Sequence, residues 1–227
     1  MKNLGKLIVI DGVDASGKET QTDLIAEKLQ KAGKKVRKIS FPAYQNASST
    51  LVKLYLSGAF GSNPEDVNAY AASSFFAADR YATFKQDWGK DYADNDTIII
   101  ADRYVSSNMI HQAGKLQTEE EKEEFMAWLD DFEYNKYGLP RPDLTIFLDM
   151  PPECGKNLMK ERANKINGSD IKDIHERNSE YMSSSYITAV NAAEKYGWMR
   201  IKCEKDGNVR TVDEINDEIF AIVKEVI

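Results

Sequence analysis

The 227-residue sequence lacks the features that mark several large classes of protein. It has only two cysteines, Cys154 and Cys203, and their separation fits neither a metal-binding motif nor a disulfide framework, so we expect reduced thiols in a cytoplasmic setting. No apolar run approaches the roughly 20 residues that span a membrane. The formal net charge of −7 argues against a broad nucleic-acid-binding surface, although a few clustered basic side chains can still bind an anionic small molecule.

The residues that are present predict alternating strands and helices. Five short runs are nearly continuous in apolar or β-branched residues, as expected of parallel strands buried on both faces: residues 7–10, 36–41, 97–101, 144–148 and 198–203. A helical stripe follows the first run over residues 20–31 and is closed by Gly33. This alternation predicts an α/β fold, a three-layer sandwich around a five-stranded parallel sheet. Because the sequence shows no repeat, low-complexity segment or linker, and its N-terminus leads straight into the first strand, we expect one domain over residues 1–227 and no signal peptide.

Local signals predict where three further helices begin. Asn-Pro-Glu at residues 63–65 is typical of a helix N-terminus and predicts a helix that reaches residue 87. Capping boxes at residues 118–121 and 211–214 predict two more. Acidic residues cluster from 119 to 133, opposite the apolar stripe of the same helix, which favours a solvated face for them.

The stretch Gly-Val-Asp-Ala-Ser-Gly-Lys at residues 12–18 lies between the first strand and a helix, which is the context that a phosphate-binding loop requires. Its glycines lack a Cβ, so the loop backbone can come close to a bound phosphate and adopt unusual backbone angles. Backbone N–H groups can then line an anion site at a helix N-terminus. Lys18 is placed to reach the β- and γ-phosphates. The expected ATP-binding residues are Gly12, Asp14, Ala15, Ser16, Gly17, Lys18, Glu19 and Thr20. A glycine-rich turn that binds nothing is the alternative.

Polar residues also follow other strands, at the sheet edge where α/β proteins bind ligands. Phe-Pro-Ala-Tyr at residues 41–44 follows the second strand, and Asp-Arg-Tyr at 102–104 follows the third. Glu19 occupies the position where Ser or Thr normally holds Mg²⁺, so Glu19 and Asp102 are the candidate metal ligands. Arg103 offers a planar fork to a phosphate. Seen alone, such an acid–base pair is as often a helix cap with a surface ion pair.

Two helical stretches place aromatic and polar side chains on a common face. Phe76 and Arg80 are four residues apart and can face one cleft, although spacing alone favours a core Phe beside a surface Arg. Asn108, His111 and Gln112 also share a face. Their amides suit the edge of a nucleobase, and buried structural amides are the common alternative.

Taken in order, these blocks resemble the thymidylate kinase family nearly end to end. The resemblance implies a P-loop nucleoside monophosphate kinase-like fold and transfer of the γ-phosphoryl group of ATP to dTMP, which forms dTDP and ADP for dTTP biosynthesis. It also implies ATP and Mg²⁺ as cofactors, small-molecule substrates and a homodimer. The matching blocks are the phosphate loop with Asp14, Phe-Pro at 41–42, Phe-Ala-Ala-Asp-Arg at 76–80, Asp-Arg-Tyr-Val-Ser-Ser-Asn at 102–108, and Gly-Leu-Pro-Arg-Pro-Asp-Leu at 138–144.

The resemblance assigns roles at the matching positions. Phe76 would stack on the thymine, and Arg103 would hold the dTMP phosphate. Arg80 would contact the base, the acceptor phosphate or both, and Asp14 would lie near the sugar 3′-hydroxyl and the metal. The full expected dTMP-binding set is Asp14, Phe41, Pro42, Tyr44, Phe76, Arg80, Arg103, Asn108, His111 and Gln112.

Family members without an arginine in the phosphate loop place a basic residue in a mobile lid, and the loop here reads Val-Asp-Ala-Ser between its glycines. The lid is expected at about residues 160–172, where Arg162 and Lys165 are equal candidates to reach the transferring group. The end of an ordinary amphipathic helix is the alternative. Lys18 and Arg103 complete the expected catalytic set. No general base is needed, because the dTMP phosphate is already anionic and catalysis rests on positioning and charge stabilisation.

Three positions depart from the family pattern. Glu19 replaces Ser or Thr, His111 replaces Tyr, and Ile110 replaces a small Ala. By the resemblance, His111 would lie near the sugar 2′ position, and the last two changes would affect selection for a deoxy sugar or for the thymine methyl. A kinase for another nucleotide or a deoxynucleoside is therefore one alternative. A nucleotide-binding protein with weakened catalysis is another, and Glu19 is its only support. Arg80 and Arg103 favour a monophosphate acceptor.

Overall fold

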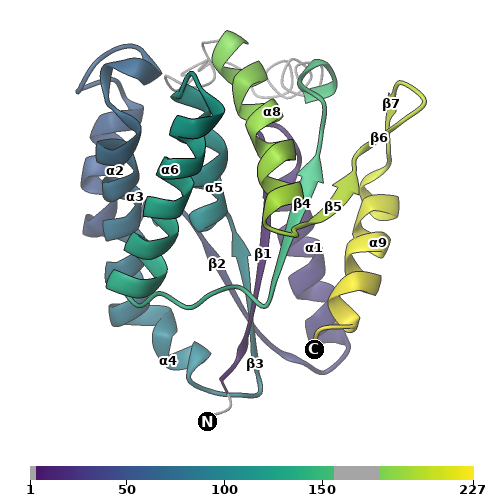
Figure 1. Cartoon of the computed structure of the whole chain (residues 1–227). Coiled ribbons are helices and arrows are strands. Elements are labelled where there is room, and N and C mark those ends of the chain that lie inside the picture. Colours follow the sequence, from purple (N-terminus) through teal and green to yellow (C-terminus); the bar gives the residue numbers. More distant parts are fainter. Residues whose placement is uncertain (1–3, 156–178) are drawn as a thin grey trace, which may run out of the picture.

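A five-stranded parallel sheet forms the centre of the molecule in the computed structural model, which describes residues 4–155 and 179–227 (Figure 1). The strand order is β2-β3-β1-β4-β5, so the first strand lies in the middle. The strands are β1 Lys6–Gly12, β2 Lys35–Ser40, β3 Thr97–Asp102, β4 Leu144–Asp149 and β5 Met199–Lys202. All five lie where the sequence predicts them, and the predicted α/β fold is confirmed.

Helices cover both faces of the sheet, so the sheet is the middle layer of a three-layer sandwich. α1 and α9 pack together on one face, α5 and α8 cover the other, and α3 and α6 lie alongside α5 (Figure 1). Among the described residues, none of the helices combines the length and the apolar character needed to cross a membrane. The α-helices are α1 Lys18–Lys31, α2 Thr50–Leu56, α3 Ala69–Thr83, α4 Gly89–Tyr92, α5 Val105–His111, α6 Glu119–Asp130, α8 Ser179–Lys195 and α9 Val212–Lys224.

Short elements complete the described chain. Single π-helical stretches, Phe84–Trp88 and Asp131–Lys136, continue α3 and α6. Three 3-10 turns are Ala47–Ser49, Pro64–Asp66 and Ala113–Lys115. Strands β6 Glu204–Lys205 and β7 Asn208–Val209 form an antiparallel hairpin before α9.

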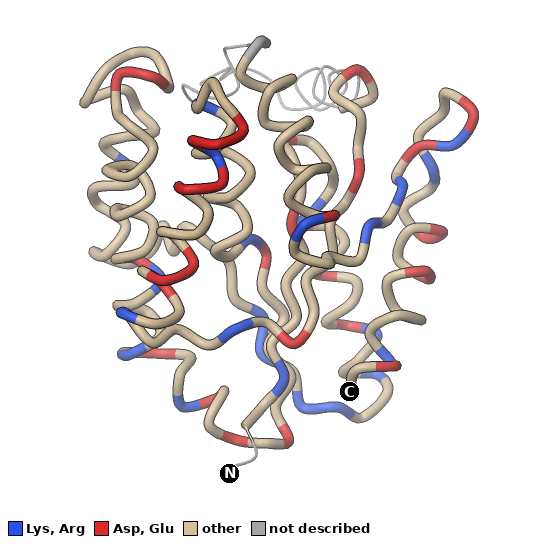
Figure 2. Tube along the Cα trace, in the orientation of Figure 1, with Lys and Arg blue, Asp and Glu red and all other residues tan. Residues whose placement is uncertain are grey.

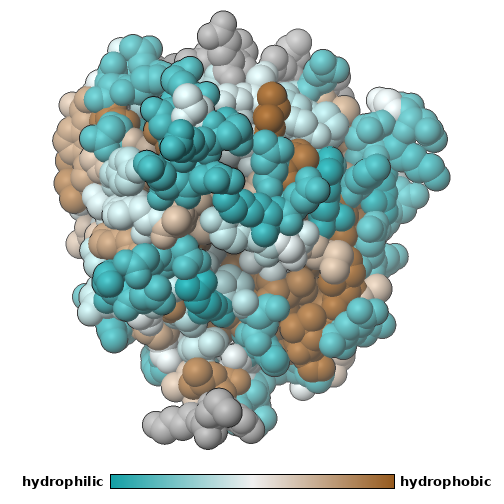
Figure 3. All heavy atoms as spheres, in the orientation of Figure 1, coloured by the Kyte–Doolittle hydropathy of each residue, from teal (hydrophilic) through white to brown (hydrophobic). Residues whose placement is uncertain are grey.

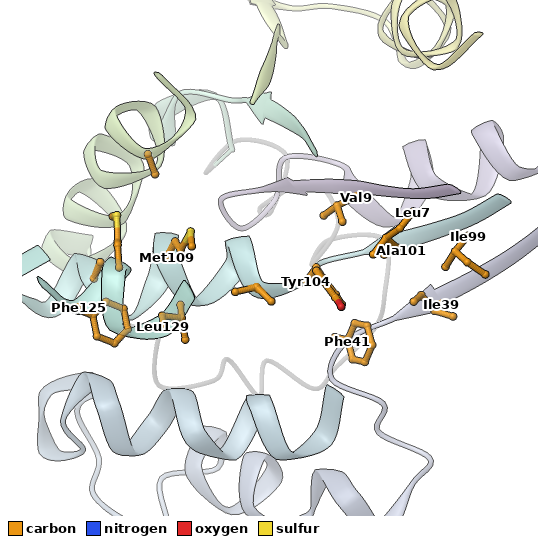
Figure 4. Packing of buried hydrophobic residues seen from close by; sticks show 14 of the residues in the cluster. Leu7, Val9, Ile39, Phe41, Ile99, Ala101, Tyr104, Met109, Phe125 and Leu129 are labelled. Atoms are coloured by element: carbon orange, nitrogen blue, oxygen red, sulfur yellow. The ribbon is translucent and has the colours of Figure 1, made fainter. Parts of the chain in front are cut away.

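Alternation along the central strand divides the core into two layers. Leu7 and Val9 point to the layer that contains Phe125 and Leu129 of α6, as Figure 4 shows. Their neighbours in the strand belong to the opposite layer, with residues of α1 and α9. Each such side chain contributes about 1.5–3 kcal/mol of burial free energy. The sheet is therefore anchored on both faces, and its polar strand ends can be presented at one edge.

The edge strands differ from the sequence prediction that all five are buried on both faces. Lys35 and Arg37 of β2 are exposed, as are Met199 and Arg200 of β5. An edge strand has a neighbouring strand on one side only, so more of its side chains reach water. Central strand β3 is fully buried, as predicted.

One predicted helix start is wrong by five residues. Asn63 and Asp66 form a capping box, but it closes only one 3-10 turn, because Val67 is extended and interrupts the helix. α3 then begins at Ala69, where the Asn68 side chain accepts a hydrogen bond from the N–H of Ala71 at 2.8 Å. The capping boxes at Thr118 and Thr211 both form as predicted.

Candidate active site

The phosphate-binding loop has the strand–loop–helix geometry that the sequence predicts. β1 ends at Gly12, and Gly17 caps the N-terminus of α1 with φ of 85°. A Cβ added at Gly12 would lie 2.7 Å from Ser16 Oγ and 2.9 Å from the Leu148 carbonyl oxygen. No side chain fits at that contact, so glycine is required for the loop to close against β4.

Lys18 lies inside this loop. Its side chain is buried, and Nζ donates hydrogen bonds to the carbonyl oxygen of Val13 at 2.7 Å and to Ser16 Oγ at 3.5 Å. Burial, followed by the charge of Arg103, lowers the pKa of Lys18 to about 8. The ammonium group is thus held at the loop centre, where a bound phosphate would offer stronger acceptors.

Arg103 joins the end of β3 to the phosphate loop. Its backbone has φ of 66°, a conformation unusual for a residue with a side chain. Nη2 donates to Asp14 Oδ1 at 2.7 Å, and Nη1 lies 3.2 Å from His111 Nε2. Burial, the largest single effect, would raise the pKa of Asp14, but the charge and hydrogen bond of Arg103 act together with other nearby basic groups, Lys18 among them, and hold that pKa far below its ordinary value. Asp14 is therefore a carboxylate under all ordinary conditions.

A cavity opens beside this ion pair at the carboxyl ends of the strands. All ten residues predicted to bind dTMP line it, and so do Leu56 and Ser107, which sequence reasoning missed. Leu56 is the last residue of α2, a short helix without a side-chain hydrogen bond at its N-cap. The lining residues are Asp14, Phe41, Pro42, Tyr44, Leu56, Phe76, Arg80, Arg103, Ser107, Asn108, His111 and Gln112.

The cavity combines an aromatic wall with buried amides. Phe76 is half-buried and meets the ring of Tyr55 edge-on, with centroids 6.1 Å apart. Asn108 Nδ2 donates to the carbonyl oxygen of Ser73 at 3.4 Å. Gln112 Oε1 is buried and has no hydrogen-bond partner among the described residues. An unsatisfied buried acceptor at a cavity wall suits a ligand that donates a hydrogen bond.

Two serines tie α5 to the base of the phosphate loop. Ser106 Oγ donates to Asp11 Oδ2 at 2.6 Å, and Ser107 Oγ donates to Asp11 Oδ1 at 2.8 Å. Asp11 also accepts from the N–H of Gly12 at 2.8 Å. The end of β1 and the start of α5 are thereby locked together, so the phosphate loop and the cavity keep a fixed relative position.

Arg80 is not the surface residue that spacing alone suggested. Its side chain is 1% exposed, and Nε and Nη2 donate to the two carboxylate oxygens of Glu133 at 2.6 and 2.5 Å. Glu133 is fully buried, so the expectation that the whole acidic cluster is solvated is wrong at this position. The π-helical stretch after α6 turns Glu133 inward, and Arg80 neutralises it.

Asp102 fits the role of a metal-organising carboxylate better than Glu19 does. Asp102 Oδ1 is buried without a hydrogen-bond partner among the described residues, and burial raises the Asp102 pKa. Glu19 and Thr20 are both exposed on the first turn of α1. Within residues 4–155 and 179–227, no three His, Cys, Asp or Glu side chains gather as a metal site. The one or two carboxylates available here, Asp102 and Glu19, suit Mg²⁺, which binds to few protein carboxylates and completes its coordination with water and substrate phosphates.

The predicted lid over residues 160–172, with Arg162 and Lys165, lies outside the described residues. The other predicted catalytic residues, Lys18 and Arg103, are both at the site. The sheet order, the phosphate loop and the adjoining cavity together define the class of P-loop nucleoside monophosphate kinase-like proteins.

Comparison with known proteins gives the particular family. A family model described as thymidylate kinase matches residues 10–211. The thymidylate kinase of Mycobacterium tuberculosis is 30% identical over 206 residues, which cover 88% of this chain and 92% of the relative. A probable thymidylate kinase of Thermococcus onnurineus is 30% identical over 220 residues, 96% of each chain. The chain belongs to the thymidylate kinase family.

A solved structure shares the fold. The thymidylate kinase of Candida albicans matches with a TM-score of 0.68 at 22% identity, over 98% of this chain and 92% of that chain.

Proposed function

We propose that this protein transfers the γ-phosphoryl group of ATP to dTMP and releases dTDP and ADP. Family membership supports this activity, and the cavity beside the phosphate loop is the observation that supports the position of the acceptor site. An aromatic wall, buried amides and two arginines face a space that adjoins the phosphate loop at Asp14. This combination suits a nucleoside monophosphate held next to ATP.

In the acceptor subsite, the thymine stacks on Phe76, and the amides of Asn108 and Gln112 face its polar edge. Arg80 lies at the same end, with its charge balanced by Glu133, which suits a base carbonyl better than a phosphate dianion. Arg103 binds the acceptor phosphate. Its present ion pair with Asp14 shows that the guanidinium already faces the phosphate loop.

In the transfer step, a phosphate oxygen of dTMP attacks the γ-phosphorus of ATP in line. The bond from that phosphorus to the β–γ bridging oxygen breaks, and ADP leaves with the electron pair. Lys18 stabilises the charge on the β- and γ-phosphates, and Arg103 holds the attacking phosphate. We assign a further cation from the lid at about residues 160–172, either Arg162 or Lys165, to the transferring group, and lid closure to the exclusion of water.

Mg²⁺ is the metal that these residues suit, with Asp102 and, less directly, Glu19 as its carboxylate candidates. When bound, it neutralises charge between the β- and γ-phosphates. The buried, unpartnered oxygen of Asp102 is the observation that supports this assignment. Glu19 is exposed and would have to act at the rim of the loop.

The whole chain, residues 1–227, is proposed to act as one cytoplasmic kinase domain in dTTP biosynthesis, and as a homodimer. Leu51 and Leu54 of α2 and Tyr70 and Tyr81 of α3 are exposed. Figure 3 shows apolar surface on the side where α2 and α3 lie, which suits association of two copies. Acidic and basic positions are interspersed along the tube in Figure 2, so we propose no nucleic-acid partner.

The test is ADP formation from ATP and Mg²⁺ with a panel of acceptors: dTMP, dUMP, UMP, dCMP and thymidine. We expect strong preference for dTMP. Preference for another monophosphate would support the same phosphoryl transfer with a different acceptor. Ile110 and His111 would then be the first residues to test for that change in specificity. Tight ATP binding without turnover on any acceptor would contradict the proposal and favour a nucleotide-binding protein with weakened catalysis.

A further inference from the structure

The imidazole of His111 lies directly against the arginine proposed to bind the acceptor phosphate. His111 is the last residue of α5 and is 7% exposed. Its Nε2 lies 3.2 Å from Arg103 Nη1, within hydrogen-bond distance.

Only one protonation state of His111 fits this contact. An arginine side chain has N–H donors and no acceptor, so Nε2 must accept. The proton of the neutral ring is then on Nδ1. Burial, with the charges of Arg103 and Lys18, lowers the pKa of His111 to about 4 against the opposing effect of Asp14 and Asp11. The electrostatics and the hydrogen-bond geometry agree on a neutral ring.

Asp14 and His111 together fix the plane of the Arg103 fork. One terminal nitrogen donates to Asp14 and the other to His111, so the guanidinium is held from two directions. The Arg103 N–H donates to the Ile10 carbonyl oxygen at 3.1 Å, which holds the unusual backbone conformation in place. Of the five side-chain N–H groups, three have no acceptor in the described chain and keep their capacity for a phosphate.

α8 holds the imidazole in turn. The ring of Tyr181 stacks on His111, with centroids 6.4 Å apart and planes 26° from parallel. The Tyr181 hydroxyl donates to the His111 carbonyl oxygen at 2.8 Å. The ring orientation is therefore set by packing from a second helix, as a preorganised site requires.

We propose that His111 is a positioning residue, whose neutral imidazole accepts a hydrogen bond from Arg103 and aligns the guanidinium for the acceptor phosphate. The proposal rests on the proposed function, because Arg103 is the phosphate ligand in that account. His111 acts through Arg103 and not on the reacting atoms.

The first test detects the hydrogen bond from Arg103 to His111 by NMR and does not depend on catalysis. The chain has two histidines, His111 and His175, so long-range ¹H–¹⁵N spectra of histidine-labelled protein at pH 7 are simple, and His111→Gln identifies the signals. We expect Nδ1 protonated and Nε2 unprotonated, with an Nε2 shift that moves in Arg103→Met. A protonated Nε2, or an Nε2 shift unaffected by Arg103→Met, would overturn the proposal.

The second test separates the hydrogen bond from the shape of the ring. His111→Phe keeps an aromatic ring without an acceptor, and His111→Gln supplies an acceptor oxygen without the ring. We expect the Phe variant to lose roughly tenfold or more in kcat/KM for dTMP, because hydrogen bonds to charged groups have about that effect. The Kd for ATP should stay unchanged, and the Gln variant should recover most of the loss.

Wild-type activity in the Phe variant would overturn the proposal, and so would equal impairment of the Phe and Gln variants, since the acceptor would then be irrelevant. Failure of the proposed function gives a different result. In that case the wild-type protein does not phosphorylate dTMP, while the spectra still report whether His111 accepts from Arg103.

Discussion

Because Arg80 and Glu133 form a buried ion pair, we expect the substitution Glu133→Gln to lower the free energy of unfolding by a large amount. Glu133→Gln keeps the size of the side chain and removes the charge that balances Arg80. Both side chains are almost fully buried, at 1% and 0% exposed. An unbalanced buried charge costs about 3–5 kcal/mol of unfolding free energy. For a chain of this length, that corresponds to a decrease in Tm of roughly 6–20 °C.

Urea unfolding of the ligand-free protein measures this loss, with Glu123→Gln as the control. Glu123 pairs with Lys195 at the surface, where an ion pair contributes at most about 1 kcal/mol. The double variant Arg80→Met with Glu133→Leu removes both charges and should recover most of the stability. A loss below about 1 kcal/mol in Glu133→Gln, equal to the control, would refute the reasoning.

Three further changes test other parts of the account. Phe76→Ala should raise the KM for dTMP roughly tenfold or more through lost base stacking, whereas Phe75→Ala, on the same helix but outside the cavity, should not; equal effects would contradict the stacking role. Glu19→Ser should lower the Mg²⁺ concentration needed for half-maximal turnover, because serine supplies the hydroxyl that normally holds Mg²⁺ at this position and the exposed Glu19 is at most an indirect ligand; an unchanged titration would remove Glu19 from the metal site. Burial lowers the pKa of Lys115 to about 7, so the unfolded chain binds that proton more tightly and stability should rise between about pH 7 and pH 10.5. Lys115→Met should flatten this part of the Tm profile, and identical profiles would contradict the burial argument.

Much of the fold could be predicted because its signals are local. A short apolar run between turn residues indicates a buried strand, and β1, β3 and β4 formed as predicted. The phosphate loop is specified by two glycines and a lysine at fixed spacing. The cavity followed from the sheet, because parallel strands present their carboxyl ends at one edge and the predicted ligands all follow such ends or lie on the helices beside them.

What the sequence did not predict depends on contacts between distant residues. Arg80 and Glu133 are 53 positions apart, and no local pattern shows that a π-helical stretch turns one acid of a charged run into the core. Leu56 was missed because α2 is only seven residues long and carries no capping signal. Burial of a strand depends on its neighbours in the sheet, which explains why β2 and β5 were expected to be more buried than they are.

The position of the long α3 helix shows the limit of a single local signal. Asn63 and Asp66 form the hydrogen bonds of a helix start, yet the chain leaves the helical conformation at Val67. Asn68 gives the second and effective cap. The helix that follows this second cap buries Ala69 and Ala72, a tertiary contact that the local signal at Asn63 does not contain.

The most direct test of the central claim is ³¹P NMR of ATP, Mg²⁺ and dTMP with the wild-type protein and with Lys18→Ala. We expect equal amounts of dTDP and ADP from the wild type, and at least a roughly hundredfold slower reaction in a Lys18→Ala variant of unchanged Tm. ATP consumption without dTDP, or near-normal dTDP formation by Lys18→Ala, would contradict phosphoryl transfer at this phosphate loop.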